Sequence, residues 1–286
     1  MSQIKITFDD AYYESCPWDI NDDAKLIQSV AKEAGRIALS YFQKTDLHQW
    51  NKSNDTPVCE GDLAVDEFLR TTLIQNRPGY GWLSEETEDH AERMRCGRLW
   101  IVDPIDGTRA FINGGDDWCV SIALIEDMKP ILGVIYVPIS DNFYFARVGD
   151  GAYLNGQKIT VSGKEHIENA HMMGNATDFQ SKKIWPQPWP STMETTSANS
   201  IALRIALVAS GFADMCVTLR PKNDWDIAAA DLIIHEAGGK LTTGDGRNLI
   251  YNRAKPLHDH IIATTPKLYD SIMLRVLPAL KMWHNA

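Results

Sequence analysis

Apolar side chains recur at helical spacing near the start of the chain. From Asp22 to Phe42 they lie three or four residues apart, which is the period of an amphipathic helix. A similar period from about Asp62 to Gln75 predicts a second helix, and Pro78-Gly79 ends it. The chain therefore opens with two helices that each need an apolar surface to pack against.

Short apolar runs follow and predict strands. Leu99 to Val102 is one such run, and it stops at Asp103. The runs 119–125 and 131–137 are rich in β-branched residues and separated by a polar turn, so they predict an antiparallel hairpin. Asn142 to Val148 predicts the next strand, and the glycines between 149 and 156 predict loops after it.

The second half alternates helices with short strands. Helices are predicted at 200–210, 227–237 and 266–281, and strands at 170–173, 213–219, 240–243 and 261–264. Residues 181–196 are rich in proline and tryptophan and follow no clear pattern; they either shape a pocket or cover the core. This alternation predicts a layered α/β or α+β fold, with an N-terminal half at 1–160 and a C-terminal half at 161–286.

Composition narrows the class of protein. The 286 residues are 44% hydrophobic, and no apolar run approaches the ~20 residues of a membrane-spanning helix. Residues 1–10 lack the pattern of a signal peptide. The five cysteines are irregularly spaced, which favours neither a disulfide framework nor a zinc site. We therefore expect a cytoplasmic protein without a membrane partner. The net charge of −10 argues against a nucleic acid polymer as partner. It allows a small anionic substrate if bound cations supply positive charge.

Carboxylates stand at the ends of several apolar elements. Asp103 and Asp106 follow a predicted strand, with Pro104 stiffening the backbone between them and Gly107 allowing a sharp turn. Two carboxylates three residues apart on one bend can face a common centre, and such oxygen ligands suit Mg²⁺. The backbone amides of Gly107 and Thr108 would lie beside that centre, where they could bind a phosphate.

Other acidic residues have a structural alternative to a role in chemistry. Glu85 belongs to a Glu-Glu pair that could be surface charge, and Asp62 and Asp226 could be helix N-caps. His235 and Glu236 lack a second histidine at zinc-binding spacing, and we interpret them as structural. The sequence also has no serine-nucleophile elbow and no P-loop.

Two signatures resemble those of the inositol monophosphatase superfamily. The first is Glu85-Glu86 followed by residues 100–108, and the second is Trp225-Asp226 followed by the Ala- and Gly-containing segment 228–239. The resemblance covers about residues 22–280. It implies a layered αβαβα sandwich, Mg²⁺-dependent hydrolysis of small phosphate monoesters, sensitivity to lithium, and a homodimer as in many members.

The resemblance also implies ligands for two or three Mg²⁺ ions. Glu85, Asp103 and the carbonyl of Ile105 resemble the ligands of a first ion. Asp103, Asp106 and Asp226 resemble those of a second.

The same resemblance implies the remaining catalytic roles. Glu85 with Asp62 and Thr108 resembles the group that orients the attacking water, while Asp106, Gly107 and Thr108 resemble the phosphate-binding segment. Cys59 and Gly61 stand where the family pattern has threonine and alanine. Because Cys59 lacks a hydroxyl, we expect one hydrogen bond near the metal loop to be missing or replaced.

The most specific expectation from the sequence concerns the substrate. Leu219 stands roughly where inositol phosphatases carry a glutamate, Lys222 follows shortly after, and Arg204 resembles a basic position of the 3'(2'),5'-bisphosphate nucleotidase branch. Basic groups suit a second phosphate, although the loop charges could equally be solvated. The sequence thus favours hydrolysis of adenosine 3',5'-bisphosphate to AMP, ahead of inositol 1-phosphate and then histidinol phosphate. A catalytically dead metal- or partner-binding protein is the alternative from another class, and the intact acidic positions argue against it.

Overall fold

The computed structural model describes residues 18–52, 56–181 and 183–283. The expectation about residues 1–10 and the thiol of Cys16 lie outside these ranges. Within them, no helix is both long and apolar enough to cross a membrane. The cytoplasmic location and the homodimer stay predictions.

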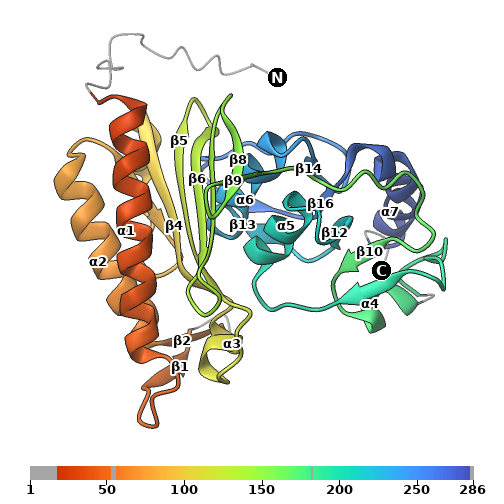
Figure 1. The fold of residues 1–286 in the computed structure, drawn as a ribbon, viewed down its shortest axis with the longest axis horizontal. Coiled ribbons are helices and arrows are strands. Elements are labelled where there is room, and N and C mark those ends of the chain that lie inside the picture. The colour runs from red at the N-terminus through yellow and green to blue at the C-terminus, as the bar shows by residue number, and fades with distance from the viewer. Residues whose placement is uncertain (1–17, 53–55, 182, 284–286) are drawn as a thin grey trace, which may run out of the picture.

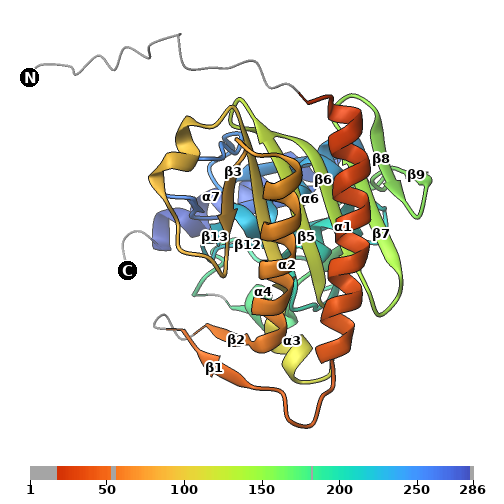
Figure 2. The same cartoon turned by 90° about the vertical axis from the view of Figure 1, so that its left-hand side faces the viewer.

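The described residues form five layers (Figure 1). Helices α1 (Ile20–Tyr41) and α2 (Glu60–Asn76) cover one face of a seven-stranded sheet, as Figure 2 shows from the helix side. Helices α5 (Ile201–Ala209) and α6 (Asp224–Glu236) lie between this sheet and a five-stranded sheet. Helix α7 (Tyr269–Trp283) lies on the outer side of the smaller sheet. The arrangement confirms the αβαβα sandwich.

The larger sheet has the order β3-β4-β5-β6-β7-β8-β9, and its only parallel pair is β3 with β4. Its strands are Gly81–Ser84, Arg98–Asp106, Cys119–Glu126, Lys129–Val137, Asn142–Arg147, Gly151–Leu154 and Gln157–Ile159. The smaller sheet has the order β11-β10-β12-β16-β14, with strands Glu194–Thr196, His171–Met173, Met215–Thr218, Ile261–Thr264 and Lys240–Thr243. Two short pairs complete the strands: β1 (Gln49–Asn51) with β2 (Pro57–Cys59), and β13 (Lys222–Asn223) with β15 (Leu257–His258).

Short helices link these elements. They are η2 (Ala91–Arg95), α3 (Thr108–Ile112), α4 (Ala176–Gln180) and η3 (Pro266–Leu268). Helix α3 follows β4 directly, so the last strand residues and the first helical turn form one continuous bend.

Three apolar clusters hold the layers together. One lies between α1, α2 and the larger sheet, and one lies beyond the smaller sheet under α7. The central cluster mixes Ile101 of the larger sheet with Ile227 of α6 and Ile261 of the smaller sheet. Both halves of the chain therefore contribute to one core, and the boundary at residue 160 stays a prediction.

Three local expectations were wrong. Strand β4 continues past Val102 to Asp106 because it goes on pairing with β5 after a bulge. Helix α6 begins at Asp224, because Asn223 closes a capping box with the third helical residue. The expected loops after β7 contain strand β8, which Asn155-Gly156 connects to β9 in a tight turn with positive φ at both residues.

The tryptophan-rich segment covers the core. Trp185 and Trp189 are buried in the outer cluster, where both rings contact Phe179 of α4. The indole N–H of Trp185 donates to the carbonyl of Asp178. This contact pattern favours the structural interpretation of the segment over a pocket.

Candidate functional site

The parallel pairing of β3 with β4 brings two carboxylates together at one sheet edge. Ser84 is the register partner of Val102, so the next residues lie side by side: Glu85, which directly follows β3, and Asp103, which is still within β4. The backbone N–H of Glu85 still donates to the carbonyl of Val102 at 3.3 Å. The carboxyl ends of adjacent parallel strands meet at the same edge, where clefts form. The parallel pairing of β3 with β4 is therefore what brings Glu85 and Asp103 together.

A bulge in β4 turns Asp106 to the same face as Asp103. Asp103 pairs with Ser121 and Asp106 with Cys119, so three steps along β4 match two along β5. Without the extra residue, side chains three apart would point to opposite faces of the sheet. Ile105 accordingly packs in the cluster under α1 and α2, while Asp106 reaches α5 on the other face. The bulge therefore places the carboxylates of Asp103 and Asp106 on the same face of the sheet.

Helix α6 supplies the carboxylate from the second half of the chain. Asp226 is the third helical residue, and its Oδ2 accepts the backbone N–H of Asn223 at 2.7 Å. Ligand atoms of Glu85, Asp103 and Asp226 all lie within 4.8 Å of one another. Three segments distant in sequence thus converge on one centre, and Asp106 lies beside them on the same strand as Asp103.

Burial and mutual repulsion disfavour the charged form of these acids. Burial, followed by the charge of Glu85, raises the pKa of Asp103 well above its usual value. Burial raises the pKa of Asp106 to about 6 and that of Asp226 to about 7, although the charge of Lys222 opposes both shifts. The positive charge near the cluster is therefore too small to offset burial and repulsion among the carboxylates.

The donor set fits Mg²⁺. Every side-chain donor in the cluster is a carboxylate oxygen, and the spacing of up to 4.8 Å lets three of them reach one small cation. A divalent cation would offset the repulsion that raises these pKa values. The carbonyl oxygen of Ile105 lies 3.0 Å from the hydroxyl of Thr108, whose one proton can go either to this carbonyl or to Asp62, so at least one lone pair of the carbonyl is left for such an ion.

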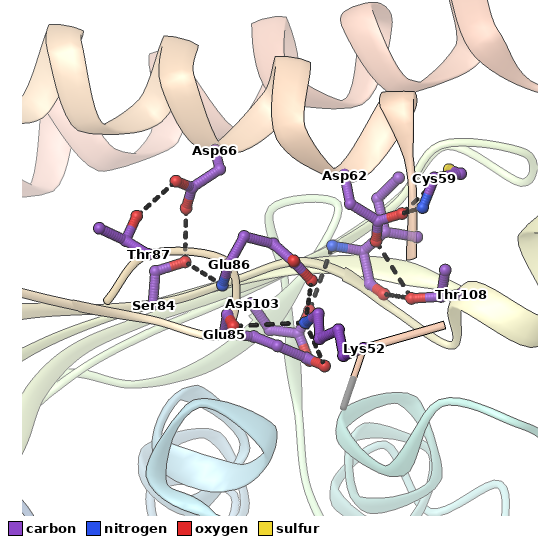
Figure 3. Close-up of polar contacts among 11 residues, drawn as sticks. Lys52, Cys59, Asp62, Asp66, Ser84, Glu85, Glu86, Thr87, Asp103 and Thr108 are labelled. Carbon is purple, nitrogen blue, oxygen red and sulfur yellow. Dashed lines mark hydrogen bonds and ion pairs between the residues drawn. The ribbon is translucent and has the colours of Figure 1, made fainter. Parts of the chain in front are cut away.

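Asp62 and Thr108 form a linked pair beside the cluster (Figure 3). The Thr108 hydroxyl lies 3.1 Å from Asp62 Oδ1, and Asp62 Oδ2 accepts both the backbone N–H and the thiol of Cys59 at 2.9 Å each. Asp62 is the third residue of α2 rather than its N-cap. The thiol of Cys59 therefore replaces the hydroxyl bond expected from threonine. Burial raises the pKa of Asp62 to about 6.

Lys52 is a site residue that sequence reasoning missed. Its ammonium donates to Glu85 Oε1 at 3.2 Å and to Glu86 Oε1 at 2.7 Å (Figure 3). A lone lysine in a polar segment carries no signal of its target, because the contact spans more than thirty residues. Glu86 is thereby paired rather than surface charge, with its side chain 4% exposed.

A second chain of contacts, also unpredicted, supports the segment that carries Glu85. Asp66 of α2 accepts the hydroxyls of Ser84 and Thr87, which flank the two glutamates (Figure 3). The backbone N–H of Glu86 donates to the Ser84 hydroxyl at 3.3 Å. Ser84 therefore ties this turn to α2 and does not cap a helix.

Gly107 is required at the end of β4. Its φ is 99°, and a Cβ there would lie 2.9 Å from the carbonyl oxygen of Asp117. Both the left-handed backbone and the close approach exclude a side chain. The turn places Thr108 at the start of α3, where the first N–H groups have no intrahelical acceptor.

The two basic residues expected to bind substrate lie in different settings. The positive charge of Lys222 acts against burial, which raises the pKa of Asp106 and of Asp226, so Lys222 lies within electrostatic range of the carboxylates. Arg204 donates from Nε to the carbonyl of Ala198, so part of its guanidinium serves the local backbone. The charges of both lower the pKa of the buried Cys216 thiol, which burial raises to about 11.

His235 and Glu236 have structural roles, as expected. His235 pairs with Asp231 one turn earlier in α6 at 2.8 Å. The carboxylate of Glu236 accepts the backbone N–H groups of Gly149 and Gly151 at 2.7 and 2.8 Å. These contacts connect α6 to the turn before β8.

Comparisons with known proteins agree with this geometry. The model of the inositol monophosphatase family matches residues 19–279. The chain is 33% identical to a histidinol-phosphatase of Mycobacterium tuberculosis over 270 residues, which cover 90% of this chain and 98% of the relative. It is 31% identical to a 3'(2'),5'-bisphosphate nucleotidase of Haemophilus influenzae over 250 residues, which cover 84% and 92%. Among solved structures, a Thermotoga maritima IMPase matches with a TM-score of 0.78 at 27% identity, covering 91% of this chain and 98% of that one.

Proposed function

The chain belongs to the inositol monophosphatase family, and from that premise we propose that it removes the 3'-phosphate of adenosine 3',5'-bisphosphate. Members are Mg²⁺-dependent phosphoric monoester hydrolases, and the chain is one of them. The proposal concerns the substrate and the residues that act on it. In it, Glu85, Asp103, Asp106 and Asp226, with the carbonyl of Ile105, hold two or three ions.

The observation that carries the substrate proposal is the position of Lys222. Its charge reaches two carboxylates of the cluster, Asp106 and Asp226. An ammonium near the phosphate site attracts a second anionic group, such as a 5'-phosphate, and Arg204 is a further positive charge whose field, like that of Lys222, reaches Cys216. The same ammonium would repel a substrate that carries an amine.

In the proposed mechanism, one set of residues holds the metal ions and the phosphate, and another set orients the attacking water. Mg²⁺ at the cluster would neutralise phosphate charge and lower the pKa of a bound water. Glu85 and Thr108 would orient the attacking water, and Asp62, whose Oδ1 lies 3.1 Å from the Thr108 hydroxyl, would accept the proton of that water through this hydroxyl. As the water oxygen bonds to phosphorus, the bond from phosphorus to the 3'-oxygen would break, and the leaving oxygen would take up a proton from solvent. The amides of Gly107 and Thr108 bind phosphate oxygens. Positioning and charge stabilisation dominate such phosphoryl transfers.

Inositol 1-phosphate fits this site less well. Leu219 stands where a hydroxyl-binding glutamate is expected, and it is buried in the outer apolar cluster. Its carbonyl accepts His260 Nδ1 at 2.7 Å, so its backbone oxygen is also engaged. Histidinol phosphate is the second candidate, because a histidinol-phosphatase is 33% identical over 270 residues, although Lys222 would disfavour the amine of this substrate.

A phosphate-release panel tests the proposal. With Mg²⁺ present, kcat/KM is compared for adenosine 3',5'-bisphosphate, adenosine 3'-monophosphate, inositol 1-phosphate and histidinol phosphate. We expect the bisphosphate to be preferred, and Lys222→Met to lower kcat/KM for it by about tenfold while changing the monophosphate little. Arg220→Met, at an exposed neighbour, is the matched control. A preference for histidinol phosphate, or an equal loss on both nucleotides, would refute the substrate assignment.

A further inference from the structure

We propose that Ser200 is a positioning residue for the metal centre. It holds the carboxylate of Asp106 by one oxygen, so that the other oxygen, Oδ1, alone faces the ions. The inference rests on the proposed function, since it assumes that Asp106 is a ligand. It adds a residue from the N-terminus of α5 to a site otherwise built from β3, β4, α2 and α6.

Two donors from α5 saturate one oxygen of Asp106. Oδ2 accepts the Ser200 hydroxyl at 2.6 Å and the backbone N–H of Ala202 at 2.7 Å. Ser200 is fully buried, and Asp106 is 8% exposed. The contact also sets a carboxylate at the start of a helix, where the dipole favours negative charge. Oδ2 is therefore satisfied within the protein, and Oδ1 is left to ligate.

Hydrogen-bond accounting fixes the direction of the Ser200 hydroxyl. Its oxygen accepts the N–H of Leu203 at 2.9 Å, as the N-cap of α5. Cys119 Sγ lies 3.3 Å from the same oxygen. An ionised carboxylate can only accept, and a hydroxyl has one proton to donate. The Ser200 proton therefore goes to Asp106, and the Cys119 thiol donates to the remaining lone pair.

This chain of contacts ties the bulged end of β4 to the second half of the molecule. Asp106 and Ser200 are 94 residues apart in sequence. Two donors on one oxygen restrict rotation about the Cβ–Cγ bond, so the carboxylate is preorganised before an ion arrives. If the Ser200 hydroxyl is removed, only the Ala202 N–H holds the Asp106 carboxylate, which can then rotate. Ordering this carboxylate would then reduce the free energy of metal binding.

Direct metal binding tests the role without relying on turnover. Mn²⁺ binding is measured by electron paramagnetic resonance at about pH 8, above the raised pKa values of about 6 for Asp106 and about 7 for Asp226, for the wild type, Ser200→Gly and Ser200→Thr. Glycine is tolerated at an N-cap with little loss of helix stability, so this variant should fold. We expect Mn²⁺ affinity to fall about tenfold in Ser200→Gly and to return in Ser200→Thr. The KM for the phosphate ester should stay nearly constant while the Mg²⁺ needed for half-maximal activity rises in parallel.

Ser210→Gly is the matched control, because Ser210 ends the same helix and its hydroxyl donates to the Leu207 carbonyl, far from Asp106 in the helix. Unchanged Mn²⁺ affinity in Ser200→Gly with a lowered melting temperature would overturn the proposal and leave Ser200 as an N-cap only. Equal losses in Ser200→Gly and Ser210→Gly would overturn it too. Failure of the wild type to bind Mn²⁺ or release phosphate would instead refute the proposed function.

Discussion

Replacing Asp226 by asparagine should stabilise the metal-free protein at alkaline pH. Burial raises the pKa of Asp226 from 3.8 to about 7. A raised pKa in an acid means that the folded state holds the proton more tightly than the unfolded chain. Its favourable contribution is thus complete below about pH 4 and is lost as pH rises through about 7. Above that pH, the folded protein carries an unfavourable charge that asparagine removes.

The size of this effect follows from the shift. About three pKa units correspond to up to about 4 kcal/mol at pH 8, at roughly 1.4 kcal/mol per unit. By the same linkage the gain falls to about 2 kcal/mol at pH 5 and becomes small near pH 4. The amide oxygen of asparagine can still accept the N–H of Asn223, so the capping contact at 2.7 Å survives. Because Asp226 is partly exposed, the actual gain in the free energy of unfolding should be smaller than these figures, but it should have the same sign.

Urea unfolding in the presence of a chelator measures the effect, with circular dichroism at about pH 8, 5 and 4. We expect Asp226→Asn to be more stable than the wild type at the highest pH, and to lose most of the stabilisation that added Mg²⁺ gives the wild type. No gain at pH 8, or a gain that does not shrink with falling pH, would refute the reasoning.

Asp224→Asn is the matched control for this experiment. Asp224 lies two residues earlier, is fully buried, and accepts His258 Nε2 and the backbone N–H of Asn252 at 2.9 Å each. Both of its oxygens therefore accept a hydrogen bond, and because asparagine would lose one of these acceptors, we expect the control to be destabilised at the pH where Asp226→Asn is stabilised. The same outcome for both variants would contradict the distinction between an acid whose oxygens are both hydrogen-bonded and an acid disfavoured by burial.

Further outcomes follow from single contacts. Thr108→Val removes the hydroxyl bonded to Asp62, and we expect kcat to fall roughly 100-fold with little change in Mn²⁺ affinity; a change in affinity alone would argue against a role in orienting water. Lys52→Gln removes an ammonium that competes with Mg²⁺ for the carboxylate of Glu85, so calorimetry should show roughly twofold to fivefold tighter Mg²⁺ binding. Weaker Mg²⁺ binding in this variant would contradict the expected competition. Gly107→Ala should cost at least about 2 kcal/mol in urea unfolding, clearly more than Gly79→Ala, which shares the positive φ but has open space; equal costs would show that the close contact is harmless.

Periodicity and strand pairing made most of the fold predictable from sequence. The helical period of α1 and the two β-branched runs of the central hairpin each depend on neighbours in sequence, and the structure has both near the expected bounds. The bulge in β4 was not visible, because it depends on which residue of β5 faces Asp106. The β8–β9 turn did carry a signal, Asn155-Gly156, which a closer reading of turn chemistry would have used.

The candidate ligands were recognised from signatures, whereas their supports were not. Glu85, Asp103 and Asp226 come together in space as the sequence led us to expect. The partners Lys52 and Ser200 reach them across long sequence separations, and neither residue type indicates its target. Local pattern identifies carboxylates that can bind metal, but only the tertiary structure shows which donors hold them in place.

The location of bound metal tests the central claim most directly. Crystals grown with Mn²⁺ would give anomalous scattering peaks at each ion. The account predicts at least one peak within bonding distance, about 2.2 Å, of carboxylate oxygens from Glu85, Asp103 or Asp226, with Asp106 Oδ1 turned toward an ion. The absence of a peak at this cluster, or Mn²⁺ bound elsewhere while the enzyme is active, would contradict it.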